Sequence, residues 1–290
     1  MRQYPLLLSL LVSGLLAGCA QAGWQQPAWI TALQTPQAIS GPVDQRDRAF
    51  DMNRRLGRGI NMGNALEAPY EGAWGMYARD EYFAVIAEAG FSHVRLPVRW
   101  NAHAKAAPPY TIDERFFERV DRAVQAGLDS GLLVVLDFHH YTGMMVDPQS
   151  NRERFLALWR QVAEHYAGYP DELLFELLNE PNDKLTASIW NDILVEALNV
   201  VRESNPTRIV VVGPERWYNV RALPTLRLPE DDPYLIASFH YYEPFHFTHQ
   251  GADWVNGSAA WLGTEWTGSA DQRWNVEADL KSAARWGEQN

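Results

Sequence analysis

Apolar residues along this chain gather in short unbroken runs, and longer segments with a helical repeat separate these runs. Each run has the length of a strand and is too short for a typical helix. An unbroken apolar run is typical of a strand that is buried on both faces, as in a parallel sheet. The sequence predicts strands of this kind at residues 58–64, 93–98, 132–138, 172–178, 208–212 and 234–242.

Helices are predicted between these strands. The clearest one opens at Thr111 and Glu114, which have the spacing of a capping box. Its apolar residues recur every three or four positions and should share one face: Ile112, Phe116, Val120, Val124 and Leu128. Further helices are predicted at residues 44–56, 79–89, 151–166, 186–203 and 275–287.

Strands that alternate with helices indicate an α/β fold, which is either a closed barrel or an open doubly wound sheet. The first strand is not followed by Gly-x-Gly-x-x-Gly, the motif of dinucleotide-binding sheets. Polar and charged residues instead follow nearly every strand, as on the catalytic face of a TIM (β/α)8 barrel. We therefore expect such a barrel, with only about six of its β/α units present in this chain.

The first 18 residues have the pattern of a bacterial lipoprotein signal peptide. Arg2 supplies the positive charge, and the apolar stretch at residues 6–16 is too short to span a bilayer. Leu16-Ala17-Gly18-Cys19 resembles a lipobox, so we expect a lipid at Cys19 that anchors the protein to a membrane. Ala20 favours the outer membrane of the cell envelope, and secretion by a plain signal peptide is the alternative.

Two further segments follow the signal peptide. Residues 19–43 carry Gln, Pro, Gly and Ser without a clear period, which is typical of a tether. Residues 44–290 carry the alternating strands and helices and should form the barrel domain, incomplete at its C-terminus.

Composition narrows the classes of partner. The chain has 290 residues, of which 47% are hydrophobic, so it can bury one large core. Its net charge is −11 and no basic stripe is interleaved with aromatic residues, which argues against nucleic-acid binding. Cys19 is the only cysteine, so no intramolecular disulfide can form. Most of the twelve Trp and twelve Tyr residues should pack in the core, and some could stack on flat ligands such as sugar rings. We expect a monomer.

One predicted strand ends in Asn179-Glu180-Pro181. Pro181 has no backbone N–H, so it ends the ladder of strand hydrogen bonds. The sequence therefore places a carboxyl group and an amide at the carboxyl end of a buried strand. In α/β barrels this is where the catalytic groups gather.

Motifs at other strand ends give this carboxyl group a context. The chain contains Gly63-Asn64-Ala65-Leu66-Glu67-Ala68-Pro69, His139-His140 and His240-Tyr241-Tyr242-Glu243-Pro244-Phe245 in that order. From about residue 56 to the last residue, this set resembles glycoside hydrolase family 5, the cellulase-type endo-β-glucanases. The resemblance implies a retaining glycoside hydrolase that cleaves β-1,4-glucan, as cellulose or mixed-linkage β-glucan, without a cofactor. An enzyme that acts on mannan or glucomannan is an alternative, because loop shapes decide among these substrates.

The resemblance also implies roles for individual residues. Glu180 matches the general acid/base, and Asn179 matches the residue that hydrogen-bonds the sugar 2-hydroxyl. Arg95 matches the arginine that pairs with the nucleophilic carboxylate, although a structural ion pair is the alternative. The other matches are the cleft residues His139 and His140, the residues that flank the nucleophile, His240 and Tyr242, and the sugar-binding residues Asn64 and Glu67.

Two side chains at the strand ends have competing interpretations. Trp217 could stack on a sugar or belong to the core, with nearly equal weight. His139 and His140 could hold a metal ion, but no third ligand lies at a familiar spacing, so we expect no metal site.

The second carboxyl group of a retaining mechanism is missing from this pattern. The resemblance implies a nucleophilic Glu on a seventh strand, in a Gly-Glu-Phe-like motif, and no such strand follows the sixth. Glu265 is the nearest look-alike, but it precedes the last helix and should not occupy that position. We therefore expect a C-terminally truncated enzyme that is inactive as this fragment, because both carboxyl groups are needed. The alternative is a barrel remnant that binds β-glucan without cleaving it.

Overall fold

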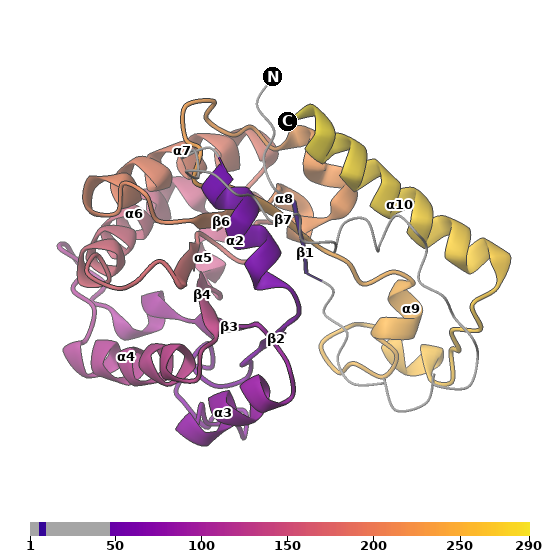
Figure 1. Ribbon diagram of the computed structural model, residues 1–290, viewed down its shortest axis with the longest axis horizontal. Coiled ribbons are helices and arrows are strands. Elements are labelled where there is room, and N and C mark those ends of the chain that lie inside the picture. Colours follow the sequence, from indigo (N-terminus) through magenta and orange to yellow (C-terminus); the bar gives the residue numbers. More distant parts are fainter. Residues whose placement is uncertain (1–5, 10–46) are drawn as a thin grey trace.

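Six parallel strands lie side by side in chain order at the centre of the molecule (Figure 1). The structure is a computed structural model that describes residues 6–9 and 47–290. The six strands are β2 (Gly59–Asn61), β3 (His93–Val98), β4 (Leu133–Phe138), β5 (Leu173–Glu176), β6 (Val210–Val212) and β7 (Leu235–His240). All five contacts between neighbouring strands are parallel. The chain therefore forms an α/β half-barrel, and the predicted partial TIM barrel is confirmed.

Side chains alternate between the two faces of each strand, which separates the polar site from the apolar core. On β3, Val94 and Leu96 are buried against the helices, whereas Arg95 points to the opposite face. The register places Asp137 of β4 beside Glu176 of β5. Charged side chains from three neighbouring strands therefore share the inner face of the half-barrel.

Long helices cover the outer face of the sheet (Figure 1). They are α3 (Asp80–Glu88), α4 (Glu114–Asp129), α6 (Pro148–His165) and α7 (Ala187–Ser204). Each turns an apolar stripe to the strands; on α7 this stripe includes Trp190, Leu194 and Val201, all essentially inaccessible to solvent. Full burial of one large aliphatic side chain stabilises a fold by roughly 1.5–3 kcal/mol, so these stripes hold the helices in place.

The start of α4 differs from the prediction. The N-cap residue is Asp113, whose carboxylate accepts a hydrogen bond from the backbone N–H of Arg115 at 2.9 Å. Thr111 cannot cap the helix, because its carbonyl accepts from the N–H of Lys105 and the next residue, Ile112, forms an antiparallel bridge with Ala104. The predicted capping box at Thr111 and Glu114 is therefore wrong, although the helix itself is confirmed.

A separate apolar cluster lies on the inner face of the half-barrel. Helix α2 (Arg48–Leu56) contributes Ala49, Met52 and Leu56 to it. The strands contribute residues that face away from the outer helices: Leu133, Val135, Leu174, Ile209, Val211 and Ile236. Helix α2 thus fills the inside of the half-barrel below the charged side chains.

Short helical turns occupy several connections and place loops around the carboxyl ends of the strands. They are η2 (Trp100–His103), α5 (Thr142–Val146), α8 (Glu215–Tyr218), η3 (Val220–Thr225), α9 (Phe245–Thr248) and η4 (Ser258–Trp261). The last helix, α10 (Ala270–Gln289), lies at the opposite end of the sheet from α3 (Figure 1). It begins before the predicted residue 275 because Ser269 and Gln272 form a capping box at its start.

The two outermost strands of the six differ in their surroundings. Within the described residues, β2 pairs only with β3. The outer edge of β7 pairs in parallel with a short strand, β1 (Leu6–Ser9), which sets Leu6 opposite Ala237 and Ser9 opposite His240. Exposed strand edges carry unpaired backbone groups that accept a further strand. Strand β1 falls within the predicted signal peptide. Cys19, the predicted tether at residues 19–43 and the first positions of the predicted barrel domain, 44–46, lie outside the described residues.

Candidate active site

Backbone strain gathers at the carboxyl ends of the strands. Positive φ angles occur at Asn64 after β2, at Glu180 after β5 and at Arg216, Trp217 and Tyr218 after β6. This conformation costs a non-glycine residue about 1–3 kcal/mol, and it persists only where surrounding contacts hold it. Strain of this kind is typical of active sites, so this end of the sheet is the candidate active site.

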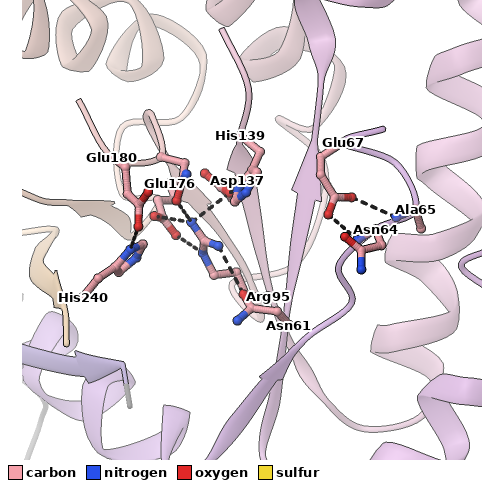
Figure 2. A network of polar contacts seen from close by, with 11 residues as sticks. Asn61, Asn64, Ala65, Glu67, Arg95, Asp137, His139, Glu176, Glu180 and His240 are labelled. Carbon is pink, nitrogen blue, oxygen red and sulfur yellow. Dashed lines mark hydrogen bonds and ion pairs between the residues drawn. The ribbon is translucent and has the colours of Figure 1, made fainter. Parts of the chain in front are cut away.

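Arg95 lies at the centre of a buried polar network, which Figure 2 shows from close by. Its Nε and Nη2 atoms donate to the two carboxylate oxygens of Glu176 at 2.7 and 2.8 Å. Nη2 also lies 2.8 Å from Oδ2 of Asp137, and Nη1 donates to Oδ1 of Asn61 at 3.1 Å. Within the described residues the carboxylate partners of Arg95 are therefore Asp137 and Glu176, and its pairing with a nucleophilic carboxylate stays a prediction.

Asn179 is oriented by the same guanidinium group. Its Oδ1 atom accepts a hydrogen bond from Nη2 of Arg95 at 2.9 Å. A guanidinium group only donates, so the amide oxygen must face Arg95 and the Nδ2 hydrogens must face away from it. Among the described residues no acceptor is hydrogen-bonded to Nδ2, so Asn179 keeps a donor there, and its contact with a sugar hydroxyl stays a prediction.

Glu180 and His240 form a close pair. Nδ1 of His240 lies 2.5 Å from Oε1 of Glu180, and the Glu180 side chain keeps 24% of its surface exposed while His240 keeps 3%. Burial raises the pKa of the Glu180 carboxyl, but the hydrogen bond and charge of His240, together with the charge of Arg95, outweigh burial and leave this pKa below its ordinary value. In this arrangement Glu180 is a carboxylate at neutral pH and accepts the proton of Nδ1.

His139 and His140 lie side by side next to this pair. Nδ1 of His139 lies 2.5 Å from Oδ2 of Asp137, and the two imidazole rings meet edge to face with centroids 4.6 Å apart. Burial and the charge of Arg95 lower the pKa of His139 to about 3, and burial lowers the pKa of His140 to about 4. Both rings are therefore neutral at physiological pH. No group of three or more His, Cys, Asp or Glu side chains that could hold a metal ion occurs in the part of the chain that the structure describes.

Asn64 and Glu67 organise the loop after β2. The carboxylate of Glu67 accepts hydrogen bonds from the backbone N–H groups of Asn64 and Ala65, the latter at 3.0 Å (Figure 2). Glu67 is buried, and burial raises its pKa. Its carboxylate therefore holds the strained backbone at Asn64, and direct contact of either residue with a sugar stays a prediction.

Trp217, in α8, and Tyr242, after β7, belong to two segments near Glu180. Trp217 is 58% exposed, so it does not belong to the core, and its backbone N–H donates to the carbonyl of Pro181 at 3.1 Å. The ring of Tyr242 meets that of His240 edge to face at 6.4 Å. Burial and the negative charge of Glu180 raise the pKa of Tyr242 to about 12, so its hydroxyl stays protonated. The phenol of Tyr242 thus lies near the Glu180 carboxylate, and the exposed Trp217 belongs to a segment that contacts the adjacent Pro181.

Two charged residues of the network were not predicted as site residues. Asp137 and Glu176 are 0% and 2% exposed. Each lies inside an otherwise apolar strand, and a charge at such a position is retained only when a partner offsets its desolvation. That signal was present in the sequence, and it would have pointed to the guanidinium group of Arg95.

Glu265 lies away from any strand, as expected. It is exposed in the irregular segment between η4 and α10. The groups that act most strongly on the charge of Glu180 are His240, His139 and Arg95, and each of them lowers the pKa. The site formed by residues 47–290 thus presents Glu180 among nitrogen bases and a guanidinium group.

Known proteins are similar to this chain in sequence and in three-dimensional structure. Residues 58–287 match the profile of the family described as cellulase (glycosyl hydrolase family 5). The chain belongs to glycosyl hydrolase family 5. It is 39% identical to Endoglucanase H of Acetivibrio thermocellus over 236 residues, which are 81% of this chain and 24% of that protein. Cellodextrinase A of Ruminococcus flavefaciens is 31% identical over 70% of this chain and 63% of its own length. This chain therefore spans less than two thirds of the length of each of these relatives.

Solved structures give the same assignment. Cel5A of Thermotoga maritima in complex with cellobiose superimposes with a TM-score of 0.82 at 49% identity, over 83% of this chain and 78% of that one. The complex of Cel5A with mannotriose gives a TM-score of 0.81 at 48% identity, over the same shares of the two chains. The family 5 chain thus shares most, but not all, of the fold of these endoglucanases.

Proposed function

We propose that this protein is a retaining glycoside hydrolase that cleaves β-1,4-glucan, with Glu180 as its general acid/base. The observation that carries the proposal is the set of side chains around Glu180. His240 lies 2.5 Å from this carboxylate, and Asn179 is held by Arg95 with its amide donor free for a sugar. The names of its relatives support β-glucan as the substrate class.

The protonation state of Glu180 bears on which further group the reaction requires. A general acid must carry a proton near neutral pH, which needs a raised pKa. Glu180 has a lowered pKa because its charged neighbours favour the carboxylate. A second carboxylate nearby would raise this pKa by repulsion between like charges, and the same carboxylate would serve as the nucleophile. We therefore expect the chemistry to need a carboxyl group that residues 47–290 do not place beside Glu180.

Hydrolysis assays test the proposal directly. We suggest producing the protein in its longest encoded form and measuring reducing ends released from carboxymethylcellulose, barley β-glucan and glucomannan. Glu180→Gln should lower the rate by at least about a hundredfold, since general acid/base catalysis contributes roughly 10²–10⁴-fold. Glu265→Gln is the matched control, because Glu265 is exposed and lies outside the site. Equal rates for the wild type and Glu180→Gln would refute the assigned role, and no hydrolysis of any β-glycan would refute the function.

Glucomannan is a second candidate substrate. The solved complex of the similar Cel5A with mannotriose is the observation that favours it. Parallel assays on mannan and cellulose derivatives distinguish the two, and a preference of more than tenfold for either would assign the substrate.

Export and membrane anchoring form a further part of the proposal. The lipobox-like Leu16-Ala17-Gly18-Cys19 supports an outer-membrane lipoprotein of the bacterial cell envelope, held by lipid at Cys19 and acting as a monomer. Across residues 6–9 and 47–290, no helix combines the length and apolar character needed to cross a membrane. Metabolic labelling with an alkynyl fatty acid should mark the wild type and not Cys19→Ser, and equal labelling of both would refute the anchor.

A further inference from the structure

Two nitrogen atoms, one of them in an ion pair, lie close to the same carboxylate oxygen of Asp137. Its Oδ2 lies 2.8 Å from Nη2 of Arg95 and 2.5 Å from Nδ1 of His139. Its Oδ1 is buried and has no hydrogen-bond partner in the part of the chain that the structure describes. The side chain is fully inaccessible, so water does not replace either partner at Oδ2.

This arrangement fixes where the proton of His139 lies. The guanidinium cation of Arg95 lies 2.8 Å from Oδ2, and its positive charge favours the ionised form of the Asp137 carboxyl. Burial raises the pKa of Asp137 to about 7, so above this pH the carboxyl is ionised and both of its oxygens can only accept. In the ionised state Oδ2 therefore accepts a hydrogen bond from His139, and the hydrogen of this neutral ring must sit on Nδ1.

The other ring nitrogen of His139 is left for a ligand. With the hydrogen on Nδ1, Nε2 carries a lone pair and can only accept a hydrogen bond. Among residues 47–290, no protein group is hydrogen-bonded to Nε2, and the side chain keeps 18% of its surface exposed. Neutral histidine in water prefers the opposite tautomer, so the structure holds this ring in its less common form.

We propose that Asp137 is a positioning residue, which holds His139 in the Nδ1–H tautomer so that Nε2 accepts a hydrogen bond from a hydroxyl group of the bound glucan. The glucan part of this inference rests on the proposed function. A sugar hydroxyl can donate and accept, and the site then offers it both kinds of partner: the amide donor of Asn179 and the acceptor of His139. The charged and titratable groups around the pair are Arg95, Glu176, Glu180, His240 and His140.

Nuclear magnetic resonance tests the tautomer without any ligand. Two-bond ¹H–¹⁵N correlations distinguish a protonated ring nitrogen from an unprotonated one, and the His139→Gln spectrum identifies the signals of His139. At pH 8.5 we expect the proton on Nδ1 in the wild type and in Asp137→Asn. The asparagine oxygen must also face Arg95, so it remains at the position of Oδ2. Asp137→Ala should shift the proton to Nε2. A wild-type His139 that is protonated on Nε2 would overturn the proposal, even if Asp137→Ala does not fold.

Binding tests the role of the acceptor. Calorimetric titration with cellotetraose should give a Kd about tenfold weaker for Asp137→Ala, the loss expected for one hydrogen bond, and within about twofold of the wild type for Asp137→Asn. Asp253→Asn, at an exposed position, is the matched control. Unchanged affinity in Asp137→Ala despite a changed tautomer would refute the hydroxyl contact. No binding by the wild type would refute the glucan part together with the proposed function, while the spectrum would still decide the tautomer.

Discussion

Replacing Asp137 by asparagine should make the folded protein more stable at alkaline pH and leave its stability nearly unchanged at pH 3.5. Asp137 is fully buried, and burial raises its pKa from 3.8 to about 7, despite the opposing charges of Arg95 and His240. The native state therefore holds a proton that the unfolded chain releases between these pH values. By linkage, such a group lowers the free energy of unfolding as the pH rises through this window.

The size of the effect follows from the same values. A difference between 3.8 and about 7 corresponds to about 4 kcal/mol at 1.36 kcal/mol for each pH unit. An asparagine has the same shape and no charge to desolvate, so it removes this dependence. The free energy of unfolding of Asp137→Asn, relative to the wild type, should therefore rise by about 4 kcal/mol from pH 3.5 to pH 8.5.

Urea denaturation at a series of pH values measures this difference. Asp253→Asn controls for the loss of one negative charge at an exposed position and should stay parallel to the wild type. A difference between Asp137→Asn and the wild type that does not change with pH, or a variant that becomes relatively less stable above pH 7, would show that Arg95 offsets the burial of Asp137 completely.

Three further substitutions probe the fold and the cleft. Arg95→Met should lower the free energy of unfolding by about 3–5 kcal/mol at pH 8, because it leaves two buried carboxylates without their cation, and denaturation of both proteins at that pH checks this. Gly213→Ala should cost about 1–3 kcal/mol, because a Cβ atom there would lie 2.6 Å from a buried tyrosine ring, whereas Gly168→Ala meets nothing within 4 Å and should be neutral in the same thermal scans. Trp217→Ala should weaken cellotetraose binding without lowering the melting temperature, since the indole is 58% exposed; Trp274→Ala, at 69% exposure on α10, should change neither, and an unchanged Kd for Trp217→Ala would remove this residue from the binding surface.

Much of the fold could be predicted because the strands are buried on both faces. Their unbroken apolar runs located β3 and β4 closely, and the order of motifs at the strand ends identified the family. Strand lengths were overestimated at the margins: β2 covers only Gly59–Asn61 of the predicted 58–64. The backbone after Asn61 turns into the strained loop that Glu67 holds, and hydrophobicity does not report such a turn.

Contacts within the site were harder to predict than its location. The strand periodicity does place Arg95, Asp137 and Glu176 on the inner face. Which oxygen faces which nitrogen depends on strand register and on the competition for one guanidinium group. The left-handed turn at Arg216, Trp217 and Tyr218 also gave no local signal, because none of the three is a glycine. It exposes the indole that sequence alone could assign equally well to the core.

Arg95 binds side chains from three other segments of the chain, and this has a consequence for sequence divergence. Asn61, Asp137, Glu176 and Asn179 all depend on one guanidinium group, through contacts of 2.7–3.1 Å. A substitution at one of these positions changes the effect of a substitution at the others. Single substitutions within this set should therefore be harmful, whereas combined substitutions should be tolerated. We expect these five positions to be inherited together in descendants of this gene.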